Sequence, residues 1–168
     1  MFRKIIVPVL LIAVLALSGC TQNIHGGGVV TLSQTEVNGV PGQLGTATMA
    51  ISFTCNDAKN KLSGVLVWND QTNNVKFTAR LPQTPVAAVF GVATCAEAAA
   101  IAQDAGISLN LALINTQGQM SGQAFVAVGE PGSALSCGSA SGVIVVTANA
   151  LPAYIAGGCL DRGNIVFN

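Results

Sequence analysis

The sequence predicts a mainly β fold, an antiparallel β-sandwich or small barrel with one short inserted helix. Segments with strand-like patterns recur at intervals of roughly ten residues, with turn signals between them, which is typical of sandwiches and barrels. Only 8% of the 168 residues are charged and 51% are hydrophobic, so the chain can form a core and is not a disordered sequence. One alanine-rich segment, at 95–106, departs from the strand pattern and predicts the helix.

The first predicted strands lie in the opening third of the chain. Gly26-Gly27-Gly28 leads into a short strand over 29–32, and the dense turn signals at 38–42 cannot continue a helix. Over 46–55, apolar residues occupy every second position, which indicates a strand with one buried face.

The clearest predicted hairpin joins strands over 62–68 and 75–81 through a polar turn. We expect Pro82 and Pro85 to interrupt the second of these strands, because proline cannot donate to a sheet ladder. A further strand is expected over 86–94.

The predicted helix over 95–106 consists mostly of strong helix formers and ends at Gly106. Thr94, with Glu97 three residues later, has the spacing of a capping box. At about three turns, the helix would be marginal alone and has to pack on the sheet. The remaining predicted strands lie over 107–114, 123–128, 142–148 and 162–167.

The two ends of the domain are expected to pair as neighbouring strands. The stretches 28–32 and 163–167 are both short, and each needs a partner for its backbone N–H and C=O groups. Pairing them would close a barrel or the edge of a sandwich.

Four cysteines, Cys55, Cys95, Cys137 and Cys159, are separated by 40, 42 and 22 residues. Zinc sites and thioredoxin-type redox sites need closely spaced pairs, so the even count favours two structural disulfides. Three connectivities are possible. Cys55–Cys95 with Cys137–Cys159 closes the shorter loops and is preferred, and four buried free thiols are the alternative.

The N-terminus has the layout of an export signal: basic Arg3 and Lys4, an apolar run over 5–17, and small residues before a cysteine. Leu17-Ser18-Gly19-Cys20 resembles the lipobox of bacterial lipoproteins. The resemblance implies cleavage before Cys20, a diacylglyceryl thioether on its sulfur and an acylated new N-terminus. The alternatives are an ordinary signal peptide with a chance cysteine, or an uncleaved anchor helix.

The lipobox reading divides the chain into a signal peptide (1–19), a tether (20–25) and a single β-domain (26–168). Thr21 stands where an Asp would favour retention in the inner membrane, so the family rule favours the outer membrane. Cleavage leaves five basic and seven acidic residues, a net charge of 5 − 7 = −2, with no basic run. The composition therefore argues against nucleic acid as a partner.

Short glycine-marked motifs recur along the β-domain: Gly26-Gly27-Gly28, Lys61-Leu62-Ser63-Gly64 with Val75-Lys76-Phe77, Gly129-Glu130-Pro131-Gly132 and Gly163-Asn164-Ile165-Val166. On these motifs, the β-domain resembles an uncharacterised domain that recurs in exported bacterial and archaeal proteins, whose biochemical activity is unassigned. The segment 95–106 looks like an insertion relative to that pattern, and Val128 stands where an acidic residue is expected.

Residues for catalysis are few. The single histidine, His25, falls in the expected tether, and the chain has no Gly-x-Ser-x-Gly elbow. A glycosidase would need a pair of carboxylates. The acidic residues fall mostly in predicted turns or on the helix, which indicates solvated positions. They are Glu36, Asp57, Asp70, Glu97, Asp104, Glu130 and Asp161.

Other binding chemistry is also weakly supported. The turn with Asn69, Asp70, Asn73 and Asn74 offers oxygen ligands for Ca²⁺ but only one carboxylate, and hairpin-turn chemistry explains the same residues. Among the aromatic residues, Trp68 and Phe77 are expected in the core, whereas Tyr154, beside Pro152, is the more exposed candidate for a carbohydrate or peptide surface.

The sequence therefore favours a non-catalytic envelope protein, anchored to the membrane through lipid on Cys20, whose disulfide-stabilised β-domain has a structural or binding role. Its partner would be a protein or a carbohydrate, and no metal or cofactor is expected. The alternatives are a small envelope enzyme with a carboxylate pair, or a ligand-carrying or inhibitory lipoprotein.

Overall fold

The protein is a closed antiparallel barrel of eight strands in the computed structural model, which describes residues 22–114, 120–148 and 153–168. Each barrel strand pairs with the next along the chain, and β1 pairs with β9 to close the barrel. A two-residue strand, β2, pairs only with the end of β1. The strands are β1 (Gln22–Val37), β2 (Val40–Pro41), β3 (Thr46–Asn56), β4 (Lys61–Asp70), β5 (Val75–Pro85), β6 (Ile107–Ile114), β7 (Met120–Gly129), β8 (Gly142–Ala148) and β9 (Tyr154–Phe167).

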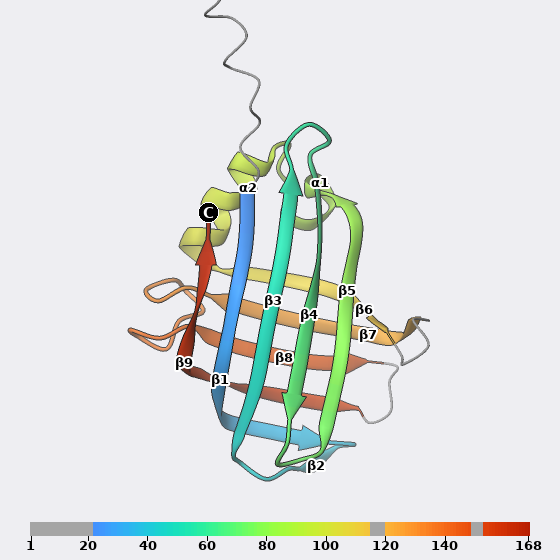
Figure 1. Ribbon diagram of the computed structural model, residues 1–168, viewed down its shortest axis with the longest axis vertical. Coiled ribbons are helices and arrows are strands. Elements are labelled where there is room, and N and C mark those ends of the chain that lie inside the picture. The colour runs from blue at the N-terminus through green and yellow to red at the C-terminus, as the bar shows by residue number, and fades with distance from the viewer. Residues whose placement is uncertain (1–21, 115–119, 149–152) are drawn as a thin grey trace, which may run out of the picture.

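The barrel is flattened into two layers whose strands cross. Strands β1, β3, β4 and β5 run along the long axis of the molecule, and β6, β7 and β8 cross behind them (Figure 1). The long strands β1 and β9, of 16 and 14 residues, pair with each other over most of their length, with register shifts at Val29/Val30 and Leu32/Gln34. Such irregularities bend a strand, which allows it to pass from one layer to the other.

Alternating side chains fill the space between the layers. The burial of β3 alternates without exception, with Ala47, Met49, Ile51, Phe53 and Cys55 inside. The alternation in β3 confirms the period-two prediction, and the predicted hairpin is present as β4 and β5. The largest fully buried side chains include Trp68, Tyr154, Phe53 and Leu66.

The triglycine lies where β1 passes between β3 and β9. Gly26, Gly27 and Gly28 have φ values of 141°, 151° and 157°, a region that side chains rarely adopt. A Cβ atom on Gly27 would lie 2.1 Å from the Met49 carbonyl oxygen, and one on Gly163, which is opposite Gly28, would lie 2.0 Å from the Gly27 oxygen. The strands therefore approach too closely here for any side chain.

The connection from β5 to β6 forms a helical cap over one end of the barrel, made of α1 (Val86–Phe90) and α2 (Cys95–Ala105) (Figure 1). The predicted capping box of Thr94 and Glu97 is present at the start of α2. The strand predicted over 86–94 is wrong. Val86, Val89 and Phe90 have helical spacing and pack on the core, and Gly91, with φ 72°, ends α1.

The span 86–105 is apolar enough, with a mean hydropathy of 1.6, to qualify by length and composition as a membrane-spanning helix. The structure divides it into two helices. The longer, α2, has 11 residues and is therefore about 16 Å long, against a bilayer core of about 30 Å. The cap is therefore a pair of short apolar helices on the barrel.

Both preferred disulfides are present, Cys55–Cys95 and Cys137–Cys159. Cys55–Cys95 joins β3 to the first residue of α2 and is buried, at 3% and 1% exposure. Cys137–Cys159 joins the 130–141 loop to β9, and Cys137 is exposed. The cysteines therefore stabilise the helical cap and the longest described loop.

The predicted pairing of the two ends is confirmed, because β1 and β9 are neighbours from Ile24↔Phe167 to Val37↔Tyr154. Both strands extend beyond the predicted ranges. The tether expected over 20–25 is too long, since β1 begins at Gln22, and His25 lies within that strand. The expected signal peptide over 1–19 and the expected lipidation site, Cys20, lie outside the described residues.

Candidate functional site

Inside the barrel, Asp70, Tyr154 and Trp68 form a buried hydrogen-bonded group. The Tyr154 hydroxyl donates to Asp70 Oδ2 at 2.7 Å and accepts from Trp68 Nε1 at 3.2 Å. The three residues are at most 1% exposed. Burial, followed by the hydrogen bond to Asp70, raises the pKa of Tyr154 well above its usual range, so the phenol stays protonated at neutral pH.

Two predictions about these residues are wrong. Tyr154 is not the exposed aromatic residue, and Asp70 is not a solvated turn residue. Asp70 ends β4 but turns inward, where Asn73 donates to its two oxygens, from the side chain at 2.7 Å and from the backbone at 3.1 Å. Protein donors therefore occupy the carboxylate proposed as a Ca²⁺ ligand.

Other acidic residues also make hydrogen bonds within the fold. Glu97 accepts from the Thr94 side chain and backbone, which lowers the pKa of Glu97. Glu130 accepts from the Phe167 backbone N–H at 2.7 Å, and Asp161 accepts from the hydroxyl of Thr31. Among the described residues, no group of three or more His, Cys, Asp and Glu side chains could hold a metal ion.

Within the described residues, the barrel has a weak seam between β5 and β6. Only three residue pairs join these strands, from Thr78↔Ile114 to Arg80↔Ala112. Beyond them, residues 107–111 of β6 pair with β7 on one side and with no described strand on the other. Pro82 and Pro85 lie in the part of β5 that follows these three pairs, and they lack the backbone N–H groups that a ladder needs.

A groove of about 360 Å³ lies along the open part of this seam, a size within the range of ligand sites in proteins. Residues of β5 and β6 line most of it, α1 contributes Ala88 and Val89, and β7 contributes Gln123. None of the residues that line it is ionisable. They are Leu81, Pro82, Thr84, Ala88, Val89, Ser108, Leu109, Asn110, Leu111, Ala112 and Gln123.

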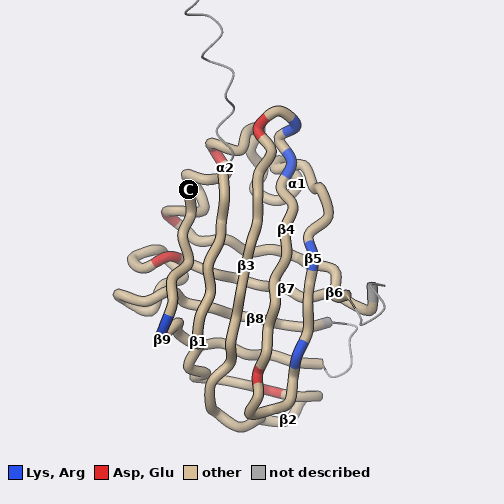
Figure 2. The backbone as a smooth tube through the Cα atoms, viewed as in Figure 1, with Lys and Arg blue, Asp and Glu red and all other residues tan. Residues whose placement is uncertain are grey.

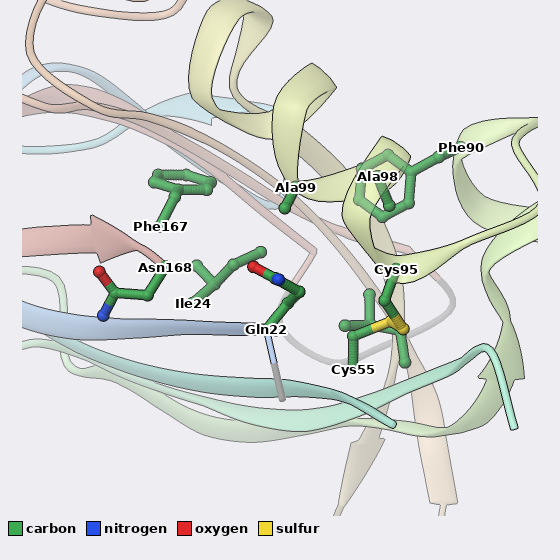
Figure 3. Close-up of a pocket in the computed structure, with 10 residues that line it drawn as sticks. Gln22, Ile24, Cys55, Phe90, Cys95, Ala98, Ala99, Phe167 and Asn168 are labelled. Atoms are coloured by element: carbon green, nitrogen blue, oxygen red, sulfur yellow. A yellow bond between two sulfur atoms is a disulfide. The ribbon is translucent and has the colours of Figure 1, made fainter. Parts of the chain in front are cut away.

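Other hollows also lie in the described part of the chain. An almost wholly apolar pocket beneath α2 lies between Ile24, Cys55, Phe90, Ala98 and Phe167 (Figure 3), but has space for about 20 Å³, roughly one water molecule. An open hollow of about 330 Å³ lies on the outer surface under the 130–141 loop. In the interior, where a carrier barrel would hold its ligand, large side chains such as Trp68 and Phe53 are packed.

Sequence reasoning did not identify the seam groove. The available signal was the pair of prolines in a segment that otherwise continues as a strand, since β5 runs on to Pro85. The prediction that the prolines interrupt the strand is wrong, because β5 continues through them and only its pairing with β6 is lost beyond Arg80. A search of protein families, curated proteins and solved structures finds no match for this chain.

Proposed function

We propose that the protein is a lipid-anchored, non-catalytic envelope protein whose barrel binds an extended segment of a partner protein at the β5–β6 seam. The observation that carries the binding site is the unpaired stretch 107–111 of β6. A sheet edge with free N–H and C=O groups is a template for an added strand, a recurrent mode of peptide recognition.

The size and chemistry of the groove support an extended polypeptide as the occupant. Five strand residues span about 17 Å, enough for a segment of similar length. The absence of ionisable residues among those that line the groove favours an uncharged segment. Carbohydrate is the weaker candidate, because Trp68 and Tyr154, which could have stacked on a sugar, are buried in the core.

The arrangement of the acidic residues supports a non-catalytic role. A retaining or inverting glycosidase needs two carboxyl groups that face each other across a substrate. Here four carboxylates accept hydrogen bonds within the fold, which stabilise a turn, a helix start and two strand positions. They belong to Asp70, Glu97, Glu130 and Asp161. His25 lies within β1, opposite Ser52 of β3 and Val166 of β9.

Two features support an envelope location. Leu17-Ser18-Gly19-Cys20 resembles a lipobox, which would place a lipid on Cys20, and Thr21 favours the outer membrane. The two disulfides are suited to an oxidising compartment outside the cytoplasm. Two or more acyl chains give stable anchoring, whereas a single chain binds marginally.

The anchor is tested with the variant Cys20→Ala, expressed in a bacterium fed a labelled fatty acid. We expect the wild-type chain to carry the label and the variant to carry none, and to accumulate as precursor or as soluble protein. Normal lipid labelling of Cys20→Ala would contradict the proposal.

The binding site is tested on the full-length protein in detergent micelles, with an acetylated and amidated heptapeptide of alternating valine and threonine as the probe. We expect the peptide to shift the backbone amide resonances of residues 107–111. A version that is N-methylated at alternate amides should bind at least about tenfold more weakly, since it lacks donors for the ladder.

Ala88→Phe fills the groove from α1 and should abolish the shifts. Ala100→Phe, at an exposed position on α2, is the matched control and should leave them unchanged. Shifts that spread over the whole barrel, or equal binding of the N-methylated peptide, would exclude strand addition at this seam.

A further inference from the structure

The helical cap has an unusually apolar outer surface. Residues 86–93 contain no polar side chain, and several of them are exposed, including Ala87 and Ala93. On α2, Ala96 and Ala100 are exposed, and Ile101 is 38% exposed. The only charged residues over 86–105 are Glu97, which is engaged in the capping box, and Asp104.

The cap is held rigidly with this surface outward. Cys55–Cys95 fixes the start of α2 to β3, and Ala98 and Ala102 pack on the barrel core. At the other end of α2, the Gln103 side chain donates to the Phe167 carbonyl oxygen at 3.1 Å. The exposed apolar residues therefore cannot turn inward without breaking these contacts.

The chain enters the barrel directly beneath this cap. Gln22, the first residue of β1, lines the apolar pocket together with Phe90, Ala98 and Ala99 (Figure 3). Cys20 precedes Gln22 by two residues, a separation of at most about 7 Å between their Cα atoms. A lipid on Cys20 would thus hold the cap within a few ångströms of the bilayer surface.

We infer that the outer surface of α1 and α2 rests on the lipid bilayer next to the anchor, with Ala93, Ala96, Ala100 and Ile101 at the level of the headgroups and upper acyl chains. The inference rests on the proposed lipid on Cys20. The β3–β4 turn beside the cap carries both acidic and basic residues (Figure 2), and headgroups would meet them there. Asp57 and Lys59 belong to this turn.

The test uses full-length protein purified from membranes and reconstituted into phosphatidylcholine vesicles with brominated acyl chains, which quench tryptophan fluorescence on contact. Ile101→Trp places a probe on the cap, and Leu44→Trp places one at 62% exposure in the β2–β3 connection, at the opposite end of the barrel. The native Trp68 is fully buried and contributes the same background to all samples.

For a side chain that lies about 5–10 Å deep in the interface, we expect the added emission of Ile101→Trp to fall by about half relative to unbrominated vesicles. Leu44→Trp should not be quenched beyond the wild-type protein. Circular dichroism and the thermal midpoint of both variants establish that they are folded.

Mass spectrometry of the N-terminal peptide in the same samples separates the two proposals. Acylated Cys20 with unquenched Ile101→Trp overturns the inference and leaves the anchor intact. An unmodified Cys20 overturns the anchor. In that case, quenching of Ile101→Trp would still support lipid contact by the cap. Unquenched Ile101→Trp emission would overturn that contact as well. Equal quenching of both probes also overturns the inference. So does an emission of Ile101→Trp that changes with protein concentration and not with lipid, which is the result expected from contact between two copies of the protein.

Discussion

The Tyr154 hydroxyl donates a hydrogen bond of 2.7 Å to Asp70 across 84 residues of sequence, joining the start of β9 to the end of β4 inside the barrel. Both residues are almost completely buried. A buried polar group without a partner is costly, so each residue depends on the other. The pair therefore fixes how the two layers meet at the end of the barrel opposite the helical cap.

Tyr154→Phe should lower the free energy of unfolding by about 1–3 kcal/mol, because it leaves a buried carboxylate with one donor fewer. Urea unfolding followed by the fluorescence of Trp68 measures the loss. The double variant Tyr154→Phe with Asp70→Asn should cost less than the sum of the single variants, since the residues interact directly. Strict additivity would show that the charge of Asp70 adds nothing to this hydrogen bond.

Alkaline pH should destabilise the protein through the same phenol. The pKa of Tyr154 is raised in the folded state, so its contribution to stability is complete below the unfolded-state pKa of about 10 and is lost as the pH rises through the folded-state pKa. Above pH 10 the free energy of unfolding should fall by up to about 1.4 kcal/mol per pH unit from this residue. Tyr154→Phe should lack this component, and identical pH profiles would contradict the assignment.

Gly27→Ala should destabilise the barrel by roughly 3 kcal/mol or more, from an unfavourable φ together with overpacking. The new Cβ atom would lie 2.1 Å from the Met49 carbonyl oxygen. Gly132→Ala is the matched control, because Gly132 also has a positive φ, 86°, but has no atom within 4 Å of a new Cβ. Equal losses for both variants in thermal unfolding would mean that φ, and not the close strand approach, is responsible.

The two disulfides should differ in their accessibility to reductant. A water-soluble phosphine should reduce Cys137–Cys159 first, because Cys137 is exposed whereas Cys55 and Cys95 are buried. Alkylation and mass spectrometry of the native protein follow the order. On the chain-entropy model, removal of either disulfide should cost on the order of 3–4 kcal/mol. Simultaneous reduction of both would indicate that the barrel opens as a unit.

Much of the architecture could be predicted from local patterns. Alternation identified β3, turn composition identified the β4–β5 hairpin, and Thr94 with Glu97 identified the start of α2. Each of these signals lies within a dozen residues. The pairing of β1 with β9 and the two disulfides followed from simple arguments about closure and loop length.

The failed predictions depend on contacts between distant segments. Asp70 and Tyr154 are buried as a hydrogen-bonded pair, and the sequence around either residue gives no sign of its distant partner. The segment 86–94 carries valines that favour a strand, yet Pro85 and Gly91 bound a single helical turn that packs on the core. The groove likewise depends on missing pairing between β5 and β6, two strands that α1 and α2 separate in the sequence, so neither segment alone predicts it.

The last residue of the chain lies beside the first strand, with Asn168 and Asn23 exchanging both backbone hydrogen bonds at 2.8 Å. Any polypeptide fused after Asn168 would emerge at the α2 end, under the surface inferred to face lipid. A C-terminal purification handle or fluorescent reporter would then wedge the barrel away from the membrane and could be mistaken for a loss of function. The exposed connection around Leu44, at the opposite end, is the position where an inserted epitope would point into open solvent.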